Sequence, residues 1–240
     1  MTAYTPAWMP IPVLAFLGTA FLLVLCALAA ILTTMTAQRA AARRALAAGF
    51  ALASAYFAVL LGFSLASHEA VLPAGGWKYF CEADCHIAYS VAAVETAAAA
   101  GPEMQQVATR EPFVIVQLQT WFDPVTISPR RGDAPLTPND RVAVLYDARG
   151  NRIPESPRGA EVRRALGLNS TPLTQALHPG ERYATYLVFE TRLEPAQLRL
   201  WVGDAAGEQR LLWGAEPSPF HKKILFALSP APARLTRNSL

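Results

Sequence analysis

The sequence predicts a two-helix transmembrane hairpin followed by an all-β antiparallel sandwich. Two observations carry this prediction: two long apolar runs lie before residue 68, and short apolar runs alternate with turn signals after it. The charges divide in the same way. Three of the 21 basic residues and none of the 18 acidic residues lie before residue 68, so residues 68–240 are formally neutral. This balance gives no electrostatic basis for nucleic-acid binding.

Residues 11–35 form the first apolar run and residues 45–67 form the second, and neither contains a charged side chain. As helices they are roughly 37 Å and 34 Å long, enough to cross a ~30 Å hydrocarbon core. Arg39, Arg43 and Arg44 lie between them. Because basic residues concentrate in cytoplasmic loops, we expect a cytoplasmic arginine loop in the inner membrane, with both termini and the sandwich on the periplasmic side.

Six segments after residue 67 combine short apolar runs with turn residues, which is typical of strands in an antiparallel sandwich. They are residues 86–95, 111–122, 141–153, 178–190, 196–214 and 221–228. The third predicts a hairpin around Asp-Ala-Arg-Gly-Asn, and Pro179-Gly180 predicts a type II turn. The segment 196–214 predicts two strands joined by a turn. Only residues 159–168 favour a helix.

Alternation along these strands predicts which side chains face the core. We expect nine residues to be largely buried: Val114, Val116, Leu118, Val142, Val144, Leu187, Phe189, Leu198 and Leu200. The first strand is ambiguous, because Ile87, Val91 and Val94 also have helical spacing. The alternation of Tyr89 and Val91 with small residues favours a strand there.

Four stretches, "AYSVAAVETA", "TWFDPVTISPRRGDAPLTPND", "VLYDARGNRI" and "LHPGERYATYLVFE", carry a family resemblance. They are similar to an uncharacterised bacterial family of membrane-anchored proteins with an immunoglobulin-like β-sandwich. The Pro-Gly-Glu turn before an apolar strand also resembles immunoglobulin-like domains of bacterial lipoproteins. The resemblance covers residues 78–228. It implies an immunoglobulin-like fold and a membrane-anchored location, and it implies no activity.

Cys81, Cys85 and His86 lie within six positions, after the second apolar run. Nearby cysteines usually pair in an oxidising compartment, provided that their Cα atoms approach within about 7 Å. Residues four apart are separated by roughly 13 Å in a strand and roughly 6 Å in a helix, so a disulfide requires a turn between them. The alternatives are free thiols or a copper(I) or zinc site formed by Cys81, Cys85, His86 and His68.

A hairpin followed by a sandwich is also similar in architecture to subunit II of haem-copper oxidases. That family carries a dinuclear copper centre on a Cys-x3-Cys loop, a spacing that Cys81 and Cys85 match. Ala83, Tyr89 and Ala92 stand where that family has its glutamate, histidine and methionine. The motif also precedes the strands, whereas that family's motif lies near the C-terminus. These departures lead us to reject a dinuclear centre.

Trp77, Tyr79 and Phe80 predict an aromatic belt that seats the exported part on the bilayer. The alternative is packing at the edge of the sandwich. The predicted organisation is a hairpin over residues 1–67, a juxtamembrane linker over 68–86, the sandwich over 87–228 and a flexible tail over 229–240.

The sequence contains no recognisable nucleophile motif and no paired carboxylates, so we predict no catalytic residue and no cofactor. We expect a non-catalytic accessory or protein-interaction module whose partners are the lipid bilayer and another membrane or periplasmic protein. The second hypothesis is a metal-handling protein that binds copper or zinc through its cysteine and histidine residues.

Overall fold

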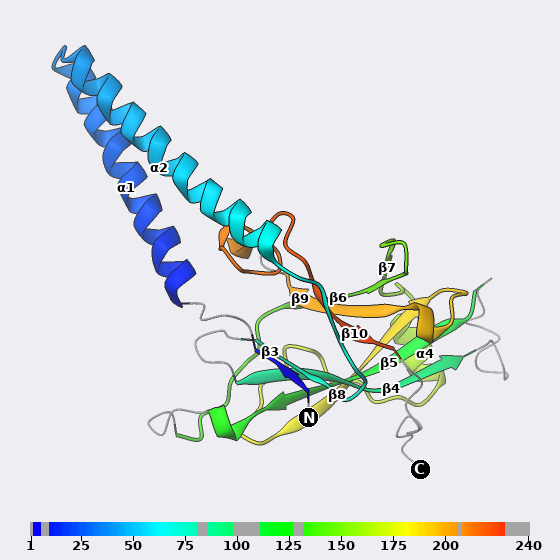
Figure 1. Ribbon diagram of the computed structural model, residues 1–240. Coiled ribbons are helices and arrows are strands. Elements are labelled where there is room, and N and C mark those ends of the chain that lie inside the picture. The colour runs from blue at the N-terminus through cyan, green and yellow to red at the C-terminus, as the bar shows by residue number, and fades with distance from the viewer. Residues whose placement is uncertain are drawn as a thin grey trace. The chain divides into compact units, whose positions relative to one another are not determined.

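The structure is a computed structural model of the 240-residue chain, in which residues 2–5, 10–80, 86–97, 111–126, 132–205 and 208–228 are described. These residues divide into two compact units (Figure 1). A helical unit contains residues 10–68 and 208–222. A β-rich unit contains the other described residues, which lie within 2–5, 69–205 and 223–228.

Two long helices dominate the helical unit: α1 (Pro10–Met35) and α2 (Arg39–Ala66). They run side by side after a tight turn (Figure 1). A Cβ on Gly49 would lie 3.3 Å from the Cβ of Cys26, so this glycine lets the helices approach closely. Most of their apolar side chains are exposed. By length and composition, both helices are candidate membrane spans, as the sequence predicted.

The second helix begins at Arg39 rather than at residue 45, so the three arginines lie in its first turns instead of in a loop. The alanine-rich sequence around them favours a helix. The apolar run in the sequence had marked only residues 45–67, which contain no charged side chain. The side chains of Arg39, Arg43 and Arg44 are all exposed.

The β-rich unit contains two five-stranded mixed sheets. Sheet A has the order β1-β3-β4-β5-β8, and sheet B has the order β2-β10-β9-β6-β7. The strands of sheet A are β1 (Ala3–Tyr4), β3 (Trp77–Phe80), β4 (Ile87–Ala97), β5 (Phe113–Phe122) and β8 (Arg182–Glu190). The strands of sheet B are β2 (Ala70–Leu72), β6 (Arg141–Tyr146), β7 (Arg152–Pro154), β9 (Arg199–Asp204) and β10 (Ile224–Ala227).

The prediction of a purely antiparallel arrangement is wrong, because β1 pairs with β3 and β2 pairs with β10 in parallel. The other strand pairs are antiparallel. Strands β2 and β3 also lie within residues 68–86, which were expected to form a linker. Strands this short carry too few residues for an alternation signal, so their pairing could not be anticipated.

Several local predictions are confirmed. The ambiguous first strand is β4, which pairs along its length with β5. The Pro179-Gly180 turn precedes β8, with Gly180 at a φ of 85° and the Glu181 N–H donating to the His178 carbonyl at 3.0 Å. Strands β6 and β7 form the predicted hairpin. The helical segment is α4 (Gly159–Ala165), which packs on β8.

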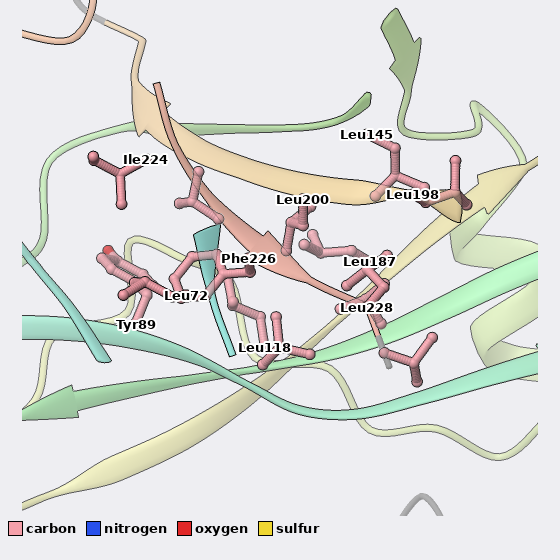
Figure 2. Close-up of a cluster of buried hydrophobic side chains, with 14 of the residues drawn as sticks. Leu72, Tyr89, Leu118, Leu145, Leu187, Leu198, Leu200, Ile224, Phe226 and Leu228 are labelled. Carbon is pink, nitrogen blue, oxygen red and sulfur yellow. The ribbon is translucent and has the colours of Figure 1, made fainter. Parts of the chain in front are cut away.

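One apolar core fills the space between the two sheets (Figure 2). Leu118 and Leu187 of sheet A meet Leu200 and Phe226 of sheet B there. Eight of the nine residues predicted to be buried are buried, and the exception is Val142, whose side chain is 37% exposed.

Strand β6 presents the opposite face from the one predicted. Leu145 and the partly buried Ala143 belong to the core between the sheets. Val144 instead packs with Trp201 and Leu225 on the other side of sheet B. Val142 lies on that outer side too, because alternate residues of a strand share a face. The residues of β6 that face the core are therefore Arg141, Ala143 and Leu145, and Val142 and Val144 face outward.

A polar cluster lies between the sheets, and we call its members Lys78, Arg141 and Asp204 the interior cluster. The Lys78 amine donates to the Val202 carbonyl at 2.8 Å and lies 3.3 Å from the Ile224 carbonyl. Arg141 forms an ion pair with Asp204, its cross-strand neighbour.

Phe80 lies beside both cations of this cluster. The Arg141 guanidinium carbon is 4.2 Å from the centre of the Phe80 ring, and the Lys78 amine is 5.0 Å from it. Lys78 is 2% exposed although lysine is rarely buried. The interior cluster therefore links sheet A to sheet B by polar contacts within an apolar core.

Residues 208–222 connect β9 to β10 but belong to the helical unit, and we call them the β9–β10 loop. The sequence predicted a second strand in this region. The structure has a short 3₁₀ helix, η3 (Glu208–Leu211), followed by turns. Trp213 packs edge-on against Phe63 and Tyr56 of α2, with ring centres 5.5 Å and 6.3 Å apart. Trp213 of this loop therefore packs against the helical unit instead of entering a sheet.

Candidate functional site

The outer face of sheet A carries four aromatic and basic side chains from three strands. Tyr79 pairs with Ala88, Ala88 with Trp121, and Trp121 with Arg182. Directly paired residues point to the same side of a sheet, so Tyr79, Trp121 and Arg182 share the outer face with Trp77. We call Trp77, Tyr79, Trp121 and Arg182 the Trp–Arg patch.

The two indoles of the patch and the Arg182 guanidinium are in mutual contact. The ring centres of Trp77 and Trp121 are 5.2 Å apart, with 56° between the ring planes. The guanidinium carbon of Arg182 lies 4.4 Å from the centre of Trp121 and 5.6 Å from that of Trp77. Such cation–π contacts hold an arginine side chain in place. Trp77 is 7% exposed, Tyr79 and Trp121 are half-buried and Arg182 is exposed.

The other end of this outer face is covered by chain. Val162 of α4 and Leu168 form an apolar cluster there with Phe113, Ile115 and Val188 of sheet A. A lone sheet face that is apolar along its whole length would expose a large hydrophobic surface. Here α4 covers one part of the face, and the Trp–Arg patch occupies another.

The hydroxyl group of Tyr79 is hydrogen-bonded to the Asp123 carboxylate. The hydroxyl donates to Oδ2 of Asp123 at 2.5 Å, and the Val125 N–H donates to Oδ1 at 2.9 Å. The Asp123 N–H in turn donates to the His86 carbonyl at 2.9 Å. Burial raises the pKa of the Tyr79 phenol, and the hydrogen bond to the Asp123 carboxylate raises it further.

This raised pKa predicts a loss of stability at alkaline pH that depends on Tyr79. Above about pH 10 an unfolded tyrosine releases its proton, whereas Tyr79 in the folded chain retains it, so stability falls as the pH rises. We expect Tyr79→Phe to reduce the loss of unfolding free energy between about pH 9 and about pH 11. Urea unfolding followed by tryptophan fluorescence measures this loss.

The variant Asp123→Asn provides the control, because it keeps the phenol buried and removes the carboxylate. We expect its loss of stability at alkaline pH to fall between those of the wild type and Tyr79→Phe. Equal losses in the wild type and Tyr79→Phe would contradict this account of the Tyr79 proton.

The structure separates the three aromatic residues that the sequence grouped as a membrane belt. Trp77 and Tyr79 lie on the outer face, whereas Phe80 is 8% exposed and belongs to the core between the sheets. Consecutive strand residues face opposite sides, which is why Phe80 cannot share a surface with Tyr79. Trp121 and Arg182 could not be assigned to this face from the sequence, because only the strand register brings them beside Trp77.

Only part of the predicted cysteine site lies within the described residues. Cys81 and Cys85 lie outside the described residues. His86 is 1% exposed, and its ring centre lies 5.6 Å from that of Phe122. His68 belongs to the helical unit. Within the described ranges no group of three or more metal-ligating side chains is found, and the described cysteine, Cys26, is a free thiol.

No protein-family model matches the chain, and no curated protein matches it. Among solved structures, the chain is similar to the crystal structure of a conserved hypothetical protein from Bacillus anthracis. The two are 14% identical over 52% of this chain and 87% of that chain, with a TM-score of 0.33. A likeness at this level carries no argument about the function of the chain.

Proposed function

We propose that this chain is a membrane-anchored, non-catalytic interaction protein with its β-rich unit outside the cytoplasm. The two exposed apolar helices support a hairpin that spans the inner membrane. Arg39, Arg43 and Arg44 begin α2, and by the positive-inside rule they assign the turn between the helices to the cytoplasm. The chain that follows α2 then lies on the periplasmic side.

The strand order supports an immunoglobulin-like sandwich for the β-rich unit. In such sandwiches one sheet contains strands A, B and E, and the other contains G, F and C, with C′ as an additional strand in some. The orders β4-β5-β8 and β10-β9-β6-β7 correspond to A-B-E and G-F-C-C′ when the strands are lettered along the chain and the letter D, for which the described residues supply no strand, is skipped. Strands β1, β2 and β3 are then additions to that arrangement.

The Trp–Arg patch is the observation that supports an interaction role. Tryptophan, tyrosine and arginine are the residues that dominate binding energy at protein–protein contacts. The patch places all three types on one sheet face, and the Arg182 guanidinium is already positioned against the indoles. A side chain that is ordered before binding loses less entropy on association. We therefore assign this face to contact with another membrane or periplasmic protein.

Native electrophoresis of gently solubilised membranes from cells that express the full chain tests this assignment. We expect the wild type to migrate in an assembly larger than the monomer. The variants Trp121→Ser and Arg182→Ala should each release it, since truncating a dominant contact residue costs about 2 kcal/mol or more of binding free energy.

The matched control is Arg149→Ala, an exposed arginine in the β6–β7 turn, and this variant should stay in the assembly. Monomeric migration of the wild type would contradict the interaction role. Patch variants that remain assembled would instead place the contact elsewhere on the chain and contradict the assignment of this face.

A metal-handling role is the second candidate, and the position of His86 favours it. This residue follows Cys85 directly in the sequence and immediately precedes β4. Its buried ring packs on Phe122, the last residue of β5. A histidine fixed in this way beside a cysteine segment is suited to copper(I) or zinc. Metal content of the full chain, purified in reductant, tests this candidate.

The thiols of the chain distinguish a disulfide from a metal site. We expect Cys81 and Cys85 to be bonded to each other, so that protein purified without reductant and then denatured alkylates only at Cys26. Intact mass measures the number of labels out of three cysteines. Three labels would exclude the disulfide, and three labels that appear only after chelation would indicate a metal site.

A further inference from the structure

The β9–β10 loop is joined to both helices of the helical unit at one end of the hairpin. The Tyr56 hydroxyl of α2 donates to the Leu211 carbonyl at 2.6 Å. The Trp213 indole N–H donates to the Pro12 carbonyl of α1 at 3.3 Å. The Lys222 N–H donates to Oγ of Ser67, just after α2, at 2.8 Å.

The depth of these contacts follows from the helix geometry. At 1.5 Å per residue, Phe63 lies about 29 Å along α2 from Arg44, which equals the thickness of a ~30 Å hydrocarbon core. Trp213 packs on Phe63. If the arginines mark one membrane surface, Trp213 lies at the opposite surface. In membrane proteins, tryptophan is enriched at the interface between the membrane and water.

Tyr56 lies roughly 10 Å deeper along α2 than Phe63, and its ring centre is 6.3 Å from that of Trp213. A phenol hydroxyl in hydrocarbon without a partner is costly. The Leu211 carbonyl supplies that partner, and so the loop reaches to the depth of Tyr56. Arg210 precedes Leu211 and is exposed, and a long arginine side chain can extend toward the headgroups from such a position.

The loop also presents apolar side chains that nothing within the described residues covers. Phe220 is 73% exposed, and Leu211 is 39% exposed. Phe220 has a positive φ of 62°, a conformation that is uncommon for a bulky residue. Hydrogen bonds hold the turn around it, from the Ser218 N–H to the Ala215 carbonyl and from the His221 N–H to the Ser218 carbonyl.

These observations point to a lipid-contacting role for the β9–β10 loop: we infer that it is seated in the outer leaflet beside the hairpin, with Phe220 in the lipid interface. Interfacial segments bury their apolar side chains about 5–10 Å into the boundary between headgroups and acyl chains, and the interval of roughly 10 Å between Phe63 and Tyr56 along α2 agrees with this range. The bilayer is the occupant because the same loop is bonded to two helices whose own apolar surfaces are exposed. This inference rests on the spanning hairpin of the proposed function.

Quenching of a site-specific dye tests this inference in the full chain reconstituted into phospholipid nanodiscs. Phe220 is replaced by p-azidophenylalanine, which keeps the aromatic ring and avoids the native cysteines, and the azide is coupled to a fluorescent dye. The same substitution at Phe50 of α2, which is 77% exposed, provides a matched position on the hairpin. Arg149 in the β6–β7 turn provides the third position.

We expect the dye at 220 to be quenched by lipids that carry a spin label near the headgroup. Iodide quenching at 220 should fall to roughly half of that at 149 or less, as for an interfacial side chain. If the dye at 50 is quenched by lipid while 220 is as accessible to iodide as 149, the loop inference is overturned and the hairpin stands. If both 50 and 220 are accessible to iodide, the spanning hairpin fails as well.

Discussion

Replacing Asp204 with alanine is expected to lower the free energy of unfolding by about 3–5 kcal/mol, the usual cost of removing one partner from a buried ion pair. The Arg141 side chain is 1% exposed and that of Asp204 is 13% exposed. In the variant, the guanidinium of an almost fully buried side chain loses this carboxylate. Its contact with the Phe80 ring replaces only a small part of that interaction.

The double variant Arg141→Met/Asp204→Leu is the matched control, because it removes both charges and keeps apolar volume. Replacing both partners of a buried pair is often neutral or stabilising, so this variant should recover most of the lost stability. Urea unfolding of the detergent-solubilised full chain measures both. A single variant as stable as the wild type would mean that the pair lies in contact with solvent and outside the core.

The second large effect is expected at Lys78, where alanine should lower the free energy of unfolding by about 3–5 kcal/mol. Two losses add in this variant. The Val202 and Ile224 carbonyls lose the Lys78 amine as a hydrogen-bond donor, and truncation leaves a cavity between the sheets.

Methionine at this position separates the two losses. Lys78→Met keeps a long side chain and removes only the donor, so it should cost about 1–3 kcal/mol. The same unfolding measurement gives the order wild type, then Lys78→Met, then Lys78→Ala. Equal stability of the methionine variant and the wild type would show that the two carbonyls do not depend on the amine.

Long apolar runs and long alternating runs in the sequence predicted the larger helices and strands correctly. Both helices were visible because an uninterrupted apolar run of more than 20 residues is too long for a strand and is typical of a helix that is long enough to span a membrane. Strands β5 and β8 were visible because long alternating runs bury one face completely. The Pro179-Gly180 turn was predictable because few residues adopt its positive φ.

Strand β6 shows why alternation is weaker in short strands. Val142 and Val144 alternate as the prediction required, but Ala143 and Leu145 alternate equally well on the other face. The choice between the faces depended on Arg141, whose place in the core requires the Asp204 carboxylate on a neighbouring strand. A single strand carries no information about that partner.

The candidate site could be predicted only in part for a similar reason. Trp77 and Tyr79 are near in sequence, so their common face followed from period two. Trp121 and Arg182 join them through the register of β4, β5 and β8, which is fixed by the whole sheet. The start of the β9–β10 loop, up to residue 214, was expected in the sheets because its apolar residues resemble a strand, whereas Trp213 packs against α2 and is hydrogen-bonded to α1.

Labelling from outside the cell is the most direct test of the central claim, which is that a spanning hairpin presents the β-rich unit outside the cytoplasm. An azide-bearing residue is placed at Arg149 in the β6–β7 turn or at Ala40 in the first turn of α2, both of which are exposed. The cells, with the outer membrane removed where they have one, then receive a membrane-impermeant cyclooctyne dye. The account predicts labelling at 149 in intact cells and at 40 only after permeabilisation. Labelling at 40 in intact cells, with 149 protected until permeabilisation, would contradict it.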